Sequence, residues 1–269
     1  MAEQDFARLL DISTLQDSRF STTPVGDGGH LFGGHTLGLA MRAACQTVDP
    51  ELWPQSLHAN FIDPGAAGRL MQLNVQSLRD SRAFAVRQVT VTQGESTPLL
   101  MQASFHAGEQ GPDWHPDQPF DYPAPESLES DETFLLNMDP IDIRPVNGPS
   151  RRGEGHMVPQ VHPFWVRPRV ALAQDPMTHA CVLAFISDYM VVGTAQAPDM
   201  KVPVGSRVVT MEHGLWFLRP FDANDWLLFT ADTVSVFHGR GLSRGNVYNR
   251  QGQLVATFVQ EVLTRLPRA

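Results

Sequence analysis

The chain has 269 residues, of which 42% are hydrophobic and 18% are charged, so it can bury one large core or two smaller ones. Its formal net charge of −9 and its scattered basic residues disfavour a nucleic acid or an anionic membrane surface, and favour a small molecule as partner. The acidic N-terminus and the absence of any run of about 18 apolar residues indicate a cytoplasmic protein that does not cross a membrane.

In chain order, the first element predicted is a helix over Gly33–Cys45, which is small and apolar on nearly every side. Alternating strands are then predicted over Leu73–Leu78, Phe84–Val91 and Leu99–His106. Residues 110–150 are rich in Pro, Asp, Glu and Ser, a composition typical of a linker.

The same order of signals returns after the linker. An apolar helix is predicted over Thr178–Val192, followed by strands over Trp226–Val236 and Gln253–Leu263. His58 and His213 are the clearest of several matching residues that lie about 155 positions apart, which indicates a duplication. We therefore expect an N-terminal repeat (1–110), a Pro-rich acidic linker (111–138) and a C-terminal repeat (139–269).

A helix that is apolar on every face must be surrounded, and the strands that follow each helix can wrap it. The predicted fold class is therefore α+β: a double hotdog, with two tandem repeats of a long central helix wrapped by an antiparallel sheet. The two cysteines, Cys45 and Cys181, fall in the two predicted helices, which predicts two buried thiols in a reducing compartment.

Asp188 stands out as a carboxylate within the second apolar helix. Burial of an unpaired carboxylate is costly, so it either bonds a nearby backbone N–H or faces a cavity as a functional acid. Thr210 and Gln260 are polar residues in apolar strands expected to cross this helix. Taken singly they are weak signals, because an ordinary strand residue is the commoner explanation for the first and an exposed alternation position for the second.

Short motifs in the same order along nearly the whole chain resemble those of the bacterial acyl-CoA thioesterase II family. They include Leu31–Gly34, His58–Gly65, Ala184–Asp188, His213–Phe221 and Val259–Glu261. The resemblance implies a hydrolase that splits acyl-CoA into a fatty acid and coenzyme A, without cofactor or metal, in fatty acid metabolism. It also implies assembly into a homo-oligomer.

The same resemblance implies that Asp188, Thr210 and Gln260 hold the water that attacks the thioester. Asp188 would act as general base, while the hydroxyl and the carboxamide orient the water. The chain departs from the family pattern at His35 and Glu212, where Gln and Asp are usual, and at Gln55.

The remaining candidate residues concern the substrate. Gly33 and Gly34 offer backbone amides at a helix start for the oxyanion, although close packing explains the pair equally well. His35 and His58 are expected beside them in the substrate-binding site. The phosphates of coenzyme A are expected to contact four arginines that surface placement explains as well, namely Arg79, Arg82, Arg240 and Arg244.

Other chemistries fit the sequence less well. Ser243 lies in a G-x-S-x-G pattern, but a hairpin rather than a helix is expected after it, which disfavours a nucleophile elbow. The histidines, including His156 and His162, do not show metal-binding spacing. Two rivals remain open: a hotdog enoyl-CoA hydratase with an Asp/His dyad, and an acyl-CoA-binding protein with little or no turnover.

The repeat offset makes a further prediction about the number of sites. An offset of about 155 places Gly33, Gln55 and Phe105 opposite Asp188, Thr210 and Gln260, the proposed catalytic trio. The first half therefore lacks the carboxylate base. We therefore expect one reactive site in each chain.

Overall fold

A computed structural model describes residues 5–26, 29–116, 120–131, 140–148, 163–189, 191–195, 203 and 205–267. Its first half carries α1 (Phe6–Leu9), β1 (Ser13–Gln16), β2 (Arg19–Thr22), α2 (Gly33–Cys45), β3 (Trp53–Phe61), β4 (Met71–Asp80), β5 (Phe84–Gln93) and β6 (Ser96–His106). Its second half carries a short 3-10 turn, η1 (Pro125–Ser127), then β7 (Ile141–Pro145), β8 (Phe164–Pro168), α3 (Pro176–Ser187), α4 (Val191–Thr194), β9 (Arg207–Phe217), β10 (Leu227–Phe237), β11 (Arg240–Tyr248) and β12 (Leu254–Arg265).

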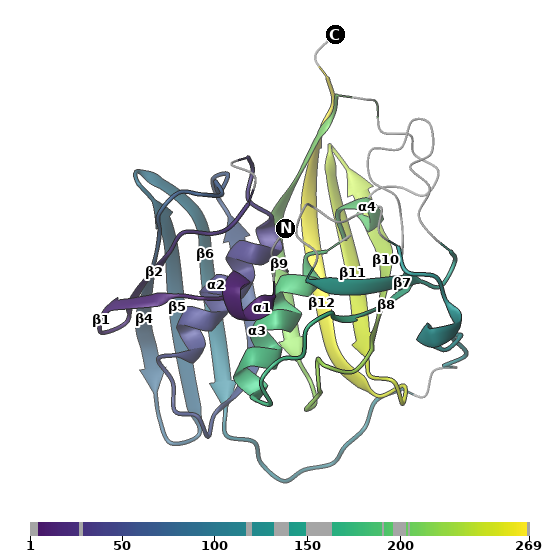
Figure 1. Cartoon of the computed structure of the whole chain (residues 1–269), viewed down its shortest axis with the longest axis horizontal. Helices are drawn as coiled ribbons and strands as arrows, with labels where there is room; N and C mark the ends of the chain where they lie inside the picture. Colours follow the sequence, from purple (N-terminus) through teal and green to yellow (C-terminus); the bar gives the residue numbers. More distant parts are fainter. Residues whose placement is uncertain are drawn as a thin grey trace.

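The twelve strands form one antiparallel sheet in the order β1-β2-β4-β5-β6-β3-β9-β12-β11-β10-β8-β7. The two halves meet where β3 pairs with β9, and the strand order on either side of this junction is the same. Each half of the sheet curves around its own central helix, and α2 and α3 lie side by side between them (Figure 1). The predicted double hotdog is confirmed.

Glycines allow the two central helices to touch, because a side chain would occupy the space between them. A Cβ added to Gly34 would lie 2.3 Å from the carbonyl oxygen of Phe185, and one on Gly38 would lie 3.2 Å from that of Cys181. The helices are therefore antiparallel, with the start of α2 beside the end of α3. Cys45 and Cys181 are both buried, free thiols, with their sulfurs 4.0 Å apart.

α3 is shorter than predicted. It begins at Pro176 behind the N-cap Asp175, whose carboxylate accepts two backbone N–H bonds, and it ends at Ser187. Asp188 is thus the C-cap rather than a residue inside the helix, because the chain turns there although its sequence remains apolar. Among the described residues, no helix is long and apolar enough to span a membrane.

The helices and strands of the two halves do not share one offset. Gly33 and Pro176 begin the central helices, about 143 residues apart, whereas β3 and β9 are related by about 156. The difference arises because 19 residues (188–206) join α3 to β9 and only 7 (46–52) join α2 to β3. The predicted counterparts of the trio, Gly33, Gln55 and Phe105, are therefore wrong.

The strand pairing gives the actual counterparts. One inward-facing row of three paired residues crosses β9, β12 and β11 beside the end of α3, and the matching row crosses β3, β6 and β5 beside the end of α2. The row in the second half is His213, Gln260 and Ser243, and the row in the first half is Leu57, Ala103 and Arg87.

Two further positions complete the comparison. Asp188 corresponds to Gln46, the C-cap of α2. Thr210 corresponds to Pro54, since each lies just before a strand bulge next to its row.

Candidate active site

Asp188 lies where the two halves of the chain meet. It is 3% exposed and comes directly after Ser187, the last residue of α3. Gly33 and Gly34, from the first turn of α2, face it across the junction, and the Gly34 N–H donates a hydrogen bond to its carboxylate. The site is therefore built from both repeats.

Thr210 and Gln260 meet Asp188 from two neighbouring strands. The Thr210 hydroxyl donates to Asp188 Oδ1 at 3.3 Å, and Gln260 Nε2 donates to Thr210 Oγ1 at 3.0 Å. Gln260 is fully buried and also donates to the carboxylate. The structure thus brings these three residues, which the sequence pointed to separately, into one hydrogen-bonded group.

A bulge in β9 makes this meeting possible. Glu261 pairs with Glu212 while Val262 pairs with Thr210, so Met211 is the extra residue in β9. Without the bulge, Thr210 and His213 would point to opposite faces of the sheet, because side chains alternate along a strand. With it, both face α3.

The environment of Asp188 changes its acidity. Burial raises the pKa of this carboxyl from 3.8 to about 7, and hydrogen bonds from Thr210, Gln260 and Gly34 act in the opposite direction. A carboxyl with a pKa near neutrality can accept a proton in one step and release it in the next.

The side of the carboxylate not held by Thr210 faces Gly33. A Cβ added to Gly33 would lie 2.6 Å from Asp188 Oδ2 and 3.0 Å from Phe61 Cε1. A side chain at this position would therefore collide with the carboxylate, so glycine is what allows Oδ2 to pack this closely against the start of α2.

Two residues behind the trio were not predicted as part of the site. His213 is 1% exposed, and its Nδ1 lies 2.7 Å from Gln260 Oε1. Its Nε2 lies 2.9 Å from the hydroxyl of Ser187, the last residue of α3. A histidine next to an apolar stretch of the strand was a signal for His213, but the sequence does not show the bulge that turns its side chain inward.

The two histidines expected in the substrate-binding site lie elsewhere. His35 is buried with Nε2 2.7 Å from the Leu9 carbonyl oxygen, so its ring faces α1. His58 is on the outer face of β3, edge-on to Trp216 at 4.9 Å between ring centres, because its neighbour Leu57 takes the inward position. The structure does not bring either side chain to Asp188.

The four arginines expected at the phosphates are split between opposite ends of the sheet. Thr210, Val262 and Gly241 lie in register, which places Arg240, at the start of β11, at the Asp188 end of the sheet, with its side chain on the outer face. Arg240 is 61% exposed and lies 3.5 Å from Glu261, and Arg244 is exposed on the outer face.

Arg79 and Arg82 lie at the far end of the first half, near the turn between β4 and β5. The two ends of β3 mark the two places: Phe61, at one end, lies beside Gly33 at the site, and Trp53, at the other end, is in register with Phe84 at that turn. The length of β3, about 26 Å at roughly 3.3 Å per residue, separates the two ends.

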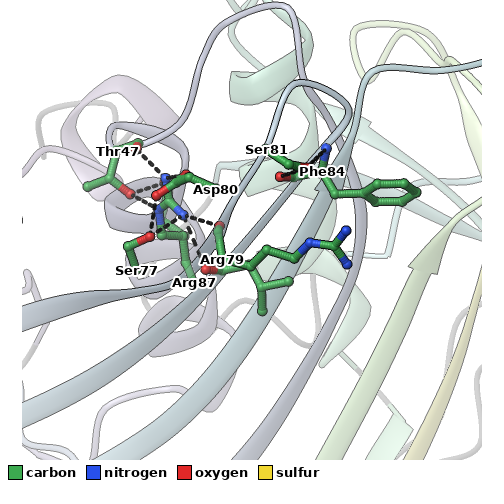
Figure 2. A network of polar contacts seen from close by, with 9 residues as sticks. Thr47, Ser77, Arg79, Asp80, Ser81, Phe84 and Arg87 are labelled. Carbon is green, nitrogen blue, oxygen red and sulfur yellow. Dashed lines mark hydrogen bonds and ion pairs between the residues drawn. The ribbon is translucent and has the colours of Figure 1, made fainter.

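The end of α2, where the counterpart of the site lies, is filled by Arg87. Its side chain is 5% exposed, and all three of its nitrogens donate (Figure 2). The acceptors are the Thr47 hydroxyl and carbonyl, the Ser77 hydroxyl, the Asp80 carboxylate, and the carbonyls of Arg79 and Val86. The corresponding residue beside Asp188 is the small Ser243.

The other chemistries considered from the sequence can be placed as well. Ser243 lies in the middle of β11, fully buried, and not between a strand and a helix. Among the described residues no three His, Cys, Asp or Glu side chains gather as a metal site would require, while His156 and His162 lie outside the described residues.

Comparison with known families supports a single functional class. A family model described as the acyl-CoA thioesterase N-terminal domain matches residues 22–106, and one described as the acyl-CoA thioesterase C-terminal domain matches residues 112–264. Human acyl-coenzyme A thioesterase 8 is 31% identical over 88% of this chain and 81% of its own length. Acyl-CoA thioesterase 2 of Haemophilus influenzae is 30% identical over 87% of both chains.

Solved structures agree with these relatives. An acyl-CoA thioesterase II, TesB2, from Mycobacterium marinum is similar with a TM-score of 0.78 and 29% identity, covering 98% of both chains. A tesB protein from Mycobacterium avium subsp. paratuberculosis gives a TM-score of 0.82 at 26% identity, again over 98% of both.

Proposed function

The chain belongs to the acyl-CoA thioesterase family, and we propose that it hydrolyses acyl-CoA by direct attack of a water molecule activated by Asp188, Thr210 and Gln260, in which Thr210 and Gln260 hold the carboxylate that takes the proton. The observation that carries this proposal is the buried Asp188 carboxylate. One of its oxygens is held by Thr210, and the other packs closely against Gly33 at the start of α2.

Asp188 acts as the general base. With a pKa raised to about 7 by burial, it is ionised in a large fraction of molecules at neutral pH yet basic enough to accept a proton. Since Thr210 donates to Oδ1, the attacking water hydrogen-bonds to a free lone pair of Oδ2. The contribution of such a base is typically about 10²–10⁴ in rate.

The reaction then proceeds without a covalent enzyme intermediate. The water oxygen bonds to the thioester carbon while its proton passes to Asp188. The resulting oxyanion is stabilised by the N–H of Gly33 at the positive end of α2, because the Gly34 N–H is already bonded to Asp188. The carbon–sulfur bond breaks, and the coenzyme A thiolate leaves with the proton that Asp188 returns.

Of the four arginines, Arg240 is the one proposed to contact coenzyme A phosphates, since it is exposed at the Asp188 end of the sheet. Assembly into a homo-oligomer, a cytoplasmic location and a role in fatty acid metabolism remain predictions of the family resemblance. Sedimentation velocity tests the first of them.

Two alternatives are separated from the proposal by one experiment. A hotdog hydratase with an Asp/His dyad is disfavoured because both ring nitrogens of His213 are engaged by Gln260 and Ser187. We would mix the protein with saturated and 2-enoyl-CoA substrates of several chain lengths, and follow thiol release and loss of the double bond in parallel. Thiol release from saturated substrates supports the proposal, whereas hydration or tight binding without turnover supports a rival.

The same proposal predicts one site in each chain. Titration of the Asp188→Asn variant with a non-hydrolysable acyl-CoA analogue should give one ligand per chain in calorimetry, because the buried Arg87 takes the matching position beside the end of α2. Two equal sites in each chain would contradict the proposal.

A further inference from the structure

Behind the proposed trio, five polar side chains form one continuous chain of hydrogen bonds. It runs from Ser187 to His213 at 2.9 Å, to Gln260 at 2.7 Å, to Thr210 at 3.0 Å and to Asp188 at 3.3 Å. Its first and last members are neighbours in sequence at the end of α3. Ser187, His213, Gln260 and Asp188 are all nine-tenths or more buried, so water does not set their orientation.

The direction of this chain follows from its last member. A carboxylate can only accept, so Thr210 donates its single hydroxyl proton to Asp188. The Thr210 oxygen then accepts from the amide nitrogen of Gln260. Consequently the amide oxygen of Gln260 faces His213, and His213 Nδ1 must carry a proton.

The same logic fixes the other side of the imidazole ring. Burial lowers the pKa of His213 to about 4, so the ring is neutral and carries one proton at neutral pH. With that proton on Nδ1, Nε2 accepts from the Ser187 hydroxyl. Ser187 Oγ also lies 2.9 Å from the Ala184 carbonyl oxygen, but its single proton can serve one acceptor at a time.

We propose that His213 is a positioning residue: held in one tautomer by Ser187, it fixes the Gln260 amide so that its nitrogen points toward Thr210 and Asp188. This inference rests on the proposed function of the trio. If the amide were reversed, its oxygen would face Thr210, and Asp188 would lose a donor that favours its ionised form.

The first half of the chain supports this assignment and supplies a test variant. Its matching positions hold Leu57 for His213, Ala103 for Gln260 and Cys45 for Ser187, so the polar chain exists in the proposed catalytic half alone among the described residues. Because Leu57 is fully buried at the matching place, His213→Leu fits a backbone that already accepts leucine.

The kinetic test is a double-mutant cycle of His213→Leu with Gln260→Ala. We expect His213→Leu to lower kcat roughly 10- to 100-fold with little change in KM, and to move the acid limb of the kcat profile to higher pH. In the Gln260→Ala background it should add almost nothing, because His213 acts through Gln260. Ser243→Ala is the matched control, because it changes another fully buried residue in the same row. It should leave both kcat and the acid limb of the kcat profile unchanged.

A spectroscopic test does not depend on activity. In the wild-type protein at neutral pH, ¹⁵N NMR should show His213 protonated at Nδ1 and bare at Nε2, and Ser187→Ala should mix the two tautomers. The opposite tautomer in the wild type, or losses of kcat that add up in the double-mutant cycle, would overturn the role of His213 but not that of the trio. Full activity in Gln260→Ala would instead contradict the proposed trio, so the two failures are distinguishable.

Discussion

Asp188 and Gln46 each follow the last residue of a central helix, yet the residues at the matching strand position of the two halves differ in charge and in size. In the second half the third position of the row holds the small Ser243, and one carboxylate oxygen of Asp188 packs against Gly33. In the first half that position holds Arg87, which is buried near the end of α2 with every nitrogen engaged. At both ends, the central helix, the row of three paired residues and the strand bulge lie in matching places.

This difference shows how a duplicated backbone separates stability from chemistry. A buried guanidinium with all its donors used stabilises the end of α2 and leaves nothing to react. A buried carboxylate whose pKa is raised by burial is unfavourable for folding at neutral pH, but it is available as a base. We therefore expect substitutions at the two ends to have opposite effects.

The largest effect is expected from Asp188→Asn. The amide preserves the shape of the carboxyl and can accept from Thr210 and Gly34, but it cannot take a proton from water. The turnover rate in a thiol-release assay should fall by about 10²–10⁴, while a non-hydrolysable acyl-CoA analogue still binds. Near-normal turnover would remove Asp188 from the mechanism.

The same variant should gain stability at neutral pH. The folded-state pKa of Asp188 is raised, so the folded protein favours the protonated form, and wild-type stability falls as pH rises from about 4 to about 7. A shift of about three pH units at about 1.36 kcal/mol each sets an upper limit of about 4 kcal/mol. Denaturant unfolding at pH 8 should show the gain, and measurements near pH 4 should not. Equal gains at both pH values would contradict burial as its cause.

Arg87→Ser gives the first half the residue type that Ser243 provides at the matching position of the second half. Several buried acceptors around Thr47 and Ser77 lose their donor, so the free energy of unfolding should fall by roughly 2–4 kcal/mol. Turnover by the folded protein should stay within about twofold, because the change lies at the other end of the sheet. Arg82→Ser, an exposed arginine near the same turn, is the control, and an equal loss of stability there would show that Arg87 is not special.

Gly33→Ala tests the close approach of Gly33 to Asp188. The new Cβ would lie 2.6 Å from Oδ2, so the carboxylate must turn away from its position, and we expect kcat to fall about tenfold or more. Gly111→Ala is the matched control, because a Cβ there meets nothing within 4 Å. If Gly33→Ala were as active as the control, the position that Gly33 gives the carboxylate would have no role in the reaction.

Much of the fold could be predicted from sequence because its signals are long and repeated: two helices apolar on every face and several alternating strands. The end of α3 could not, because apolar residues continue past Ser187 and no glycine or proline marks the turn. The candidate trio came from family resemblance, since neither the bulge at Met211 nor the pairing of Thr210 with Val262 leaves a pattern in the sequence.

The misplaced histidine has a specific cause. His58 matches His213 at an offset of 155, but the faces of the two strands match at 156, where Leu57 corresponds to His213. A shift of one residue moves a side chain to the other face of a sheet, so His58 lies outside while His213 lies beside Gln260.

The smallest effect is expected from Ser243→Ala. Ser243 lies in the same inward row as Gln260, and its hydroxyl reaches the Gln260 carbonyl oxygen at 3.4 Å, a long contact that contributes little. Turnover and thermal stability should both remain close to those of the wild type, and mass spectrometry during turnover should find no acyl group on the protein. A large loss of activity together with an acylated Ser243 would replace the water mechanism by a covalent one. The contrast between Ser243 and Arg87 would then be one between a nucleophile and a structural residue.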